Sequence, residues 1–164
     1  MPLLVATAGG GCVIPPSLSI DNQDAGQNSP PAILAVRSDE AELPEQTTVI
    51  FNRGTGSLNV ELLDTDVNDT LQVRVFVGYT FDDPKPQRAT CTAPPISNAK
   101  RTATCDLTAL CTVDDVMRSA TAPLSMSVVV FDRIPLESGT PAFQAMPEGG
   151  LSTNRFFFLK CTEM

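Results

Sequence analysis

The chain has 164 residues, of which 42% are hydrophobic and 18% are charged, and its formal net charge is −8. It contains no histidine, which excludes a Ser-His-Asp triad, a Cys-His dyad and any zinc site that needs an imidazole ligand. Its 19 acidic residues, set against 11 basic ones, would repel the phosphates of a nucleic acid, so we expect no nucleic-acid partner.

Residues 1–11 read MPLLVATAGGG, a short apolar stretch that runs into small residues immediately before Cys12. This is how the end of a signal peptide looks. The segment resembles that of a bacterial lipoprotein precursor, in which a signal peptidase cuts before a cysteine that then carries the lipid. The resemblance implies that residues 1–11 are a signal-peptide remnant, that Cys12 is lipidated, and that the true start lies upstream. Alternatively, Cys12 is an ordinary thiol in an N-terminal tail.

Residues 13–31 are rich in Pro, Ser, Asn, Gln, Asp and Gly and show no apolar periodicity. Such a composition cannot bury enough surface to order itself. We therefore expect residues 12–31 to be a lipidated cysteine followed by a disordered, flexible tether. A random coil of this length spans roughly 20–25 Å, enough to hold a domain clear of lipid headgroups. An ordinary disordered N-terminus would have the same composition.

Residues 32–164 consist of short segments of alternating character separated by turn residues, a pattern typical of an antiparallel β-sandwich. One short helix is expected over 112–120, where Thr112 and Asp115 form a capping box. Asp114 lies in the first turn, where a negative charge interacts favourably with the helix dipole. Seven or eight strands are expected, over residues 33–37, 47–51, 57–63, 71–77, 88–92, 102–107, 125–131 and 155–161.

The stretch from residue 59 to residue 77 reads NVELLDTDVNDTLQVRVFV, two alternating segments around an acidic turn. Together with residues 28–36, which read NSPPAILAV, it resembles the opening of an immunoglobulin-like domain found in envelope lipoproteins of Gram-negative bacteria. The resemblance covers about twenty-five residues and implies an all-β, immunoglobulin-like antiparallel sandwich rather than an activity. Its matching positions are Asp64, Asp66, Asp69, Leu71, Arg74 and Phe76.

The acidic turn over 64–69 begins with the D-x-D-x-N spacing of a calcium-binding loop. It lacks the glycine at the sixth position and the glutamate at the twelfth, so it is not an EF-hand. Two interpretations stay open. Asp64, Asp66 and Asp69 could hold a calcium ion, the one cofactor that we consider, or the segment is a tight turn in which Asx side chains bond their own backbone.

Five cysteines are many for a reducing compartment, and their spacing matches no zinc or CxxC pattern. Apart from Cys12, we expect two disulfides, for which three pairings are possible. A hairpin joining the strands around Cys91 and Cys105 would place these two opposite each other. Cys111, before the helix, would then pair with Cys161 on the last strand, and this is the pairing that we favour. The alternative is that one of these cysteines is a reactive thiol nucleophile, but the chain has no histidine that could activate it.

The connection over 134–153 is long for a small sandwich and carries Phe143, Met146 and Leu151 among prolines and glycines. These residues could form a partner-binding loop, or they could fold back and cap the open end of the sandwich. In the final strand, Phe156 and Phe158 lie on the face opposite Phe157. That strand is therefore either central in its sheet or covered by a partner.

Together, these features lead us to expect a lipid-anchored, non-catalytic binding or structural subunit of the bacterial outer membrane, facing the periplasm or the cell surface. Loops at one end or an edge strand would engage a protein partner. The alternative function is a carbohydrate-binding or enzyme-accessory module at the cell surface. The absence of tryptophan and the presence of a single tyrosine, Tyr79, argue against it, because sugar platforms depend on aromatic faces.

Overall fold

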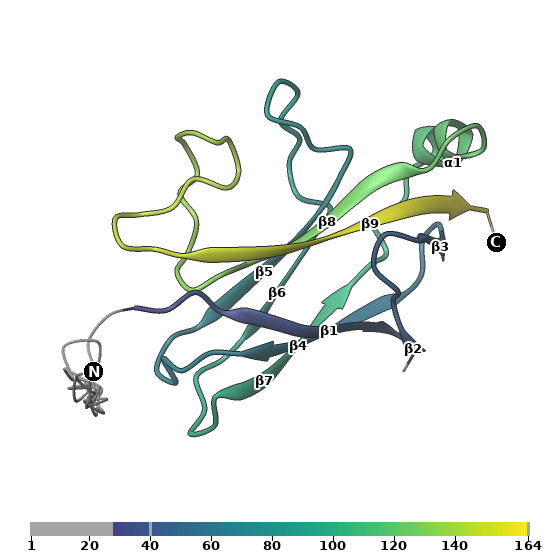
Figure 1. The fold of residues 1–164 in the computed structure, drawn as a ribbon. Helices are drawn as coiled ribbons and strands as arrows, with labels where there is room; N and C mark the ends of the chain where they lie inside the picture. Colours follow the sequence, from purple (N-terminus) through teal and green to yellow (C-terminus); the bar gives the residue numbers. More distant parts are fainter. Residues whose placement is uncertain (1–27, 40, 164) are drawn as a thin grey trace, which may run out of the picture.

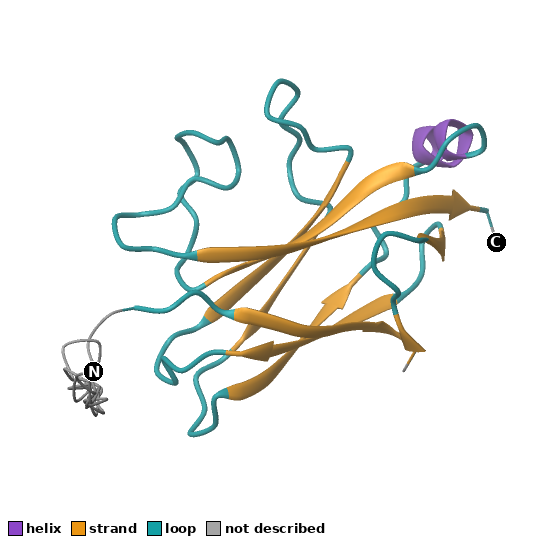
Figure 2. Cartoon of the chain, viewed as in Figure 1, coloured by secondary structure: helices purple, strands orange, loops and turns teal. Residues whose placement is uncertain are grey.

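The computed structural model describes residues 28–39 and 41–163, and in this part of the chain nine strands form two sheets beside one short helix. Figures 1 and 2 show the two sheets facing each other, with the helix near the C-terminus. The elements are β1 (Ala32–Ser38), β2 (Ala41–Glu42), β3 (Thr48–Asn52), β4 (Ser57–Leu63), β5 (Leu71–Val77), β6 (Ala89–Ala93), β7 (Lys100–Asp106), α1 (Val113–Ser119), β8 (Leu124–Phe131) and β9 (Ser152–Thr162).

The fold is mostly β with one short helix, as the alternating pattern predicts, and each of the eight expected segments contains a strand. The two-residue strand β2 was not expected; it forms a hairpin with the end of β1. The lipid site at Cys12, the signal-peptide remnant over 1–11 and most of the tether over 12–31 lie outside the described residues.

The strand order is β2-β1-β4-β7 in the four-stranded sheet and β3-β9-β8-β5-β6 in the five-stranded sheet. The chain therefore changes sheet five times: between β2 and β3, between β3 and β4, between β4 and β5, between β6 and β7, and between β7 and β8, across α1. All pairings are antiparallel except that of β3 with β9, which is parallel. This order puts β9 in the interior of its sheet, as expected if its two faces both carry phenylalanines.

The core lies between the two sheets, because each strand turns alternate side chains inward. Leu58, Val60 and Leu62 of β4 face Val73 and Val75 of β5, and all five are fully buried. Burying a side chain of this kind stabilises the fold by about 1.5–3 kcal/mol relative to leaving it exposed. The regular alternation is what made these strands recognisable in the sequence.

A disulfide between Cys91 of β6 and Cys105 of β7 joins the edge strands of the two sheets, with 4.9 Å between the Cα atoms. The favoured pairing is confirmed, but the reason given for it was wrong. β6 and β7 do not form a hairpin, because they belong to different sheets. The disulfide thus closes one side of the core. On the other side, the Arg155 guanidinium donates to the Ile33 carbonyl at 2.8 Å.

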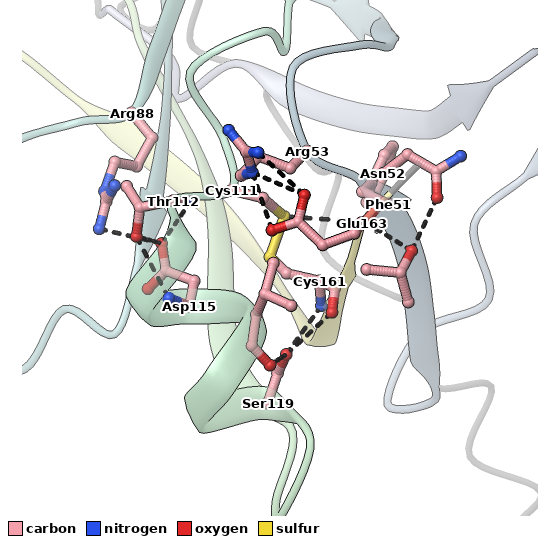
Figure 3. Close-up of a disulfide and its surroundings, with 12 residues drawn as sticks. Phe51, Asn52, Arg53, Arg88, Cys111, Thr112, Asp115, Ser119, Cys161 and Glu163 are labelled. Carbon is pink, nitrogen blue, oxygen red and sulfur yellow. Dashed lines mark hydrogen bonds and ion pairs between the residues drawn. A yellow bond between two sulfur atoms is a disulfide. The ribbon is translucent and has the colours of Figure 1, made fainter.

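The second disulfide, between Cys111 and Cys161, attaches the start of α1 to β9. The Thr112 hydroxyl accepts the Asp115 N–H, and the Asp115 carboxylate accepts from Thr112, which confirms the predicted capping box. Asp115 also pairs with Arg88 at 3.2 Å. Figure 3 shows these groups around the disulfide. No described helix is long and apolar enough to cross a membrane.

The other end of α1 is attached to β9 by one side chain. The Ser119 hydroxyl accepts the N–H of Cys161 at 3.0 Å and donates to its carbonyl at 3.2 Å (Figure 3). Strand β8 begins only at Leu124, which lies opposite Leu159, so it does not reach this part of β9. Ser119 therefore satisfies two buried backbone groups that would otherwise lack a partner.

Candidate functional site

The candidate site is the outer face of the five-stranded sheet, which is the face turned away from the core. Cross-strand pairing places Phe156 of β9 beside Ser127 of β8, and Ser127 beside Phe76 of β5. Phe158 of β9 lies opposite Ser125 of β8. Aromatic side chains therefore extend across the outer face of three neighbouring strands, which is unusual for a solvated sheet surface.

One half of this face, which we call the covered half, is buried. Phe76, Val129 and Phe131 form a second apolar cluster separate from the core, and both phenylalanines are fully buried. Tyr79, Phe143 and Met146 pack against them. The cover is the connection between β8 and β9, which leaves and rejoins the sheet at one end (Figure 1). This explains why Phe76 is buried although it interrupts the alternation of β5.

Two polar contacts fasten the connection to the sheet. Nη1 of Arg74 donates to the carbonyl oxygen of Phe143 at 2.6 Å, and the Arg74 guanidinium lies 5.8 Å from the centre of the Phe131 ring. The Tyr79 hydroxyl donates to the carbonyl oxygen of Ala142 at 2.8 Å. Burial lowers the pKa of Arg74 and raises the pKa of Tyr79. The raised pKa means that burial beneath the connection favours the neutral phenol of Tyr79 over the phenolate.

The connection is compact enough to act as a cover. The Leu136 N–H donates to the Ala145 carbonyl at 2.8 Å, which closes a smaller loop within it. Ala145 is buried, and a Cβ at Gly139, where φ is +132°, would come within 2.8 Å of the Ala145 Cβ. Glycine is therefore required at position 139 both for its backbone conformation and for close packing.

Of the three residues expected in a partner-binding loop, Phe143 and Met146 pack against the outer face of the sheet. Phe143 and Met146 are half-buried against the second apolar cluster, and the Leu151 N–H donates to the Asp132 carboxylate at 2.8 Å. The alternative, in which the connection folds back, describes the structure better. The connection lies over the outer face of the sheet, however, rather than over the open end of the sandwich.

The other half of the face, which we call the bare half, has no such cover among the described residues. Phe156 is 61% exposed, Phe158 49% and Ile50 of β3 64%. Between the two rings is an apolar hollow of about 160 Å³, lined by Gln46, Ser125 and residues 156–158. Ser125, opposite Phe158, lines the hollow, and its small side chain leaves the space beside the rings open.

The five-stranded sheet differs from the four-stranded sheet in the acidic residues that its strands carry. None of the 19 acidic residues of the chain lies in the five strands of this sheet, which carry Arg74, Arg155 and Lys160. The four-stranded sheet, in contrast, includes Glu42, Glu61 and Asp106. An apolar face without carboxylates is therefore present in a protein whose net charge is −8.

The acidic turn holds an arginine. Nη2 of Arg101 donates to Oδ2 of Asp64 at 2.8 Å, with both side chains buried, and the guanidinium also donates to the carbonyls of Asp66 and Asp69. The Asp66 N–H donates to Oδ1 of Asp64 at 3.0 Å, which confirms the tight-turn interpretation. Burial raises the pKa of Asp64, against the opposing effects of that N–H and of Arg101.

The predicted calcium site at Asp64, Asp66 and Asp69 is not assembled. Arg101 supplies the positive charge that a calcium ion would have supplied, and Asp66 turns toward Ser29, whose N–H it accepts at 3.2 Å. Among residues 28–39 and 41–163, no three acidic or cysteine side chains are close enough together to hold a metal ion. Arg101 could not be assigned this place from sequence, because it follows the turn by more than thirty residues.

The remaining buried carboxylates also have structural partners. Asp115 caps α1 and pairs with Arg88, as described above. Asp132 accepts the Leu151 N–H at the base of the connection and also accepts from the Asn28 side chain. These contacts neutralise or hydrogen-bond each buried acid of the described chain.

No protein-family model matches the chain, and no curated protein sequence matches it. The functional interpretation therefore depends on the residues and contacts described above.

Proposed function

We propose that this chain is a non-catalytic binding or structural subunit of a bacterial cell envelope, anchored to the outer membrane by a lipid on Cys12. Its immunoglobulin-like domain would present a protein-binding face at the end of the tether. The observation that carries the proposal is the bare half, where two phenylalanines are exposed side by side on an interior strand. Apolar groups concentrated on one surface favour protein association.

The strand order supports an immunoglobulin-like topology. If β1, β4 and β7 stand for strands A, B and E, then β9-β8-β5-β6 repeats the order G-F-C-C′ of a variable-type immunoglobulin sheet. The helix lies between E and F. The disulfides differ from those of antibody domains, which join B to F; here Cys91–Cys105 joins C′ to E.

The two disulfides support the envelope assignment, since such bonds form and persist in oxidising compartments. The lipid on Cys12 rests on the sequence before that cysteine. The non-catalytic role is supported by the absence of histidine and by the structural use of Asp64, Asp115 and Asp132. Tyr79, the one tyrosine, is fastened to the connection rather than offered as a sugar platform.

Photo-crosslinking in intact envelopes tests the binding face. A benzophenone amino acid replaces Phe158 in the full chain, and in a matched control it replaces Phe81, which is 72% exposed but lies outside the sheet. We expect a discrete protein crosslink from position 158 and none from position 81. A chain that gives no protein crosslink from position 158 contradicts the proposed binding face.

Metabolic labelling with a palmitate analogue tests the anchor separately. We expect the label on the full chain, loss of the label in Cys12→Ser, and release of that variant from the membrane fraction. Unlabelled wild-type chain, or label retained in Cys12→Ser, would exclude the lipid from this position without bearing on the binding face.

A further inference from the structure

We infer that the partner of the bare half is a second copy of this chain, packed sheet against sheet about a two-fold axis. This inference deepens the proposed function by naming the partner, and it rests on that function only in taking the bare half to be a protein-binding face. Face-to-face packing of two sheets is a general arrangement in proteins, with the sheets about 10 Å apart.

The first argument is electrostatic. Two copies that each carry a net charge of −8 repel each other over most of their surfaces. The strands of the five-stranded sheet carry no carboxylate, and Lys160 is the one charged side chain that its bare half exposes, so two copies can meet there without bringing acidic side chains of these strands together. A basic protein would instead be attracted to the acidic parts of the molecule. The absence of carboxylates from these strands therefore favours a partner surface that is apolar and poor in charge, as this face itself is.

The second argument is shape. A two-fold interface requires one surface that is complementary to itself. The bare half carries both elements: the projecting ring of Phe156, and the hollow of about 160 Å³ beside it above Ser125. A cavity of about 150 Å³ is enough to hold a benzene ring. The Phe156 ring of each copy can therefore enter the hollow of the other copy, so that both rings are buried and both hollows are filled.

The connection between β8 and β9 does not obstruct this arrangement. It covers Phe131 and Phe76 at one side of the face and leaves Phe156, Phe158 and Ile50 open. A two-fold axis that lies between the two sheets and runs perpendicular to their strands makes the strands of the two copies run in opposite directions. It therefore places the two connections at opposite ends of the interface. Each connection then borders the interface instead of colliding with its equivalent.

The exposed area predicts a weak dimer. A phenylalanine offers about 150–250 Å², so the two rings of one copy leave roughly 165–275 Å² open, to which Ile50 adds a smaller amount. Even with the surrounding polar residues, two copies bury less than the roughly 1,200 Å² of a standard interface. We therefore expect a dissociation constant that is roughly micromolar or weaker, and two-dimensional confinement of tethered copies on a membrane would favour pairing.

Sedimentation of the full, oxidised chain over a range of concentrations tests the inference. Wild type should pass from a monomer of 17.5 kDa toward twice that mass as its concentration rises. Phe156→Ser combined with Phe158→Ser should raise the dissociation constant at least about tenfold. Phe81→Ser, which removes a still more exposed ring outside the face, should leave the dissociation constant unchanged. All of these residues are exposed, so the variants should retain the fold, and the melting temperature checks this.

A second variant tests the arrangement without removing a ring. Ser125→Glu fills the hollow and adds a carboxylate to the acid-free face, so it should abolish association as well. Lys160→Glu, on the same face of β9, should weaken association, and added salt should restore part of it. Ser125→Glu that leaves the dimer intact would overturn the mutual insertion of Phe156.

The outcomes separate this inference from the proposed function. A concentration-dependent dimer that is lost in the ring and Ser125 variants and kept in Phe81→Ser supports it. A chain that stays monomeric up to high concentration, or a dimer unaffected by these variants, overturns it. So does a position-158 crosslink to a different protein or to residues 1–27 of the same chain. A crosslink to a different protein leaves the proposed binding function standing, whereas no intermolecular crosslink at all contradicts both.

Discussion

The covered and bare halves of the outer face belong to the same sheet and both carry phenylalanines, yet only one half is buried. In the covered half, Phe76 and Phe131 are fully buried beneath the connection between β8 and β9. In the bare half, Phe156 and Phe158 are half or more exposed. In the covered half, the chain buries its own aromatic surface beneath a long connection that is hydrogen-bonded to the sheet. The bare half is an equivalent surface for which the described chain supplies no cover.

Such a cover has a cost in conformational entropy that its contacts must offset. Closing a long loop costs little more than closing a short one, because the entropy grows only with the logarithm of its length. Ordering its residues is more costly and must be offset by contacts. The Arg74 and Tyr79 hydrogen bonds and the burial of Phe143 provide them over the covered half.

The largest difference between the halves should appear on truncating one ring in each. Phe131→Ala removes a fully buried side chain and should lower the free energy of unfolding by about 3–5 kcal/mol. Phe156→Ala should cost less than about 1 kcal/mol, because its ring already contacts water. Urea unfolding of the two variants measures this, at concentrations where the wild-type chain is monomeric. Equal losses would abolish the distinction between the halves.

Removing the arginine that fastens the cover should have the next largest effect. Arg74→Met loses the charged hydrogen bond to the Phe143 carbonyl and the contact with the Phe131 ring, at a cost of about 1.5–3 kcal/mol. Lys160→Met, a matched change on the bare half, should stay within about 0.5 kcal/mol. Limited proteolysis should cut the connection faster in Arg74→Met. Unchanged cutting would mean that Arg74 does not hold the cover.

High pH should loosen the covered half by a smaller amount. Burial raises the pKa of Tyr79 in the folded state, so its contribution to stability is complete below the ordinary tyrosine pKa of about 10 and is lost as the pH rises through the folded value. The phenolate also cannot donate to the Ala142 carbonyl. Since Tyr79 is the one tyrosine and the chain has no tryptophan, ultraviolet titration follows it directly.

The control for this titration is Tyr79→Phe, which should cost about 1 kcal/mol at neutral pH and lose the pH dependence attributed to the phenol. A Tyr79 that titrates at its ordinary value in the folded chain would show that the hydroxyl is not held beneath the connection.

The smallest effect on stability is expected at Ile50 in the bare half. Ile50→Thr keeps a β-branched side chain in β3 and removes apolar surface that is already 64% exposed, so unfolding should change by no more than about 0.5 kcal/mol. Thermal unfolding of dilute protein measures it. A loss of several kcal/mol would mean that Ile50 is covered within the monomer.

Several strands could be predicted because their side chains alternate between a buried and a more exposed face. The segments around Leu58 and Val73 alternate in this way, and the capping box at Thr112 needs only residues three positions apart. Such signals are local, so one sequence contains them in full. The two phenylalanines that flank Phe157 indicated either a central strand or a strand covered by a partner, and the strand order shows that β9 is central.

What could not be predicted depends on contacts between distant residues. Phe76 looked like an exception in β5 because its cover comes from Phe143 and Met146, far along the chain. Cys91 and Cys105 were paired correctly for a local reason, a hairpin, whereas the true reason is the meeting of two sheet edges. The acidic turn suggested calcium because its counter-charge, Arg101, lies on another strand.

Hydroxyl-radical footprinting across a range of protein concentrations tests the central claim most directly, because it reads both halves of the face in one sample. In dilute protein, Phe156 and Phe158 should be oxidised readily, while Phe76 and Phe131 are protected. As the concentration rises, Phe156 and Phe158 should become protected and the exposed Phe81 should not. Oxidation of Phe156 and Phe158 that is independent of concentration, or oxidation of Phe131 as fast as that of Phe156, would contradict the assignment of the bare half as an interface between copies.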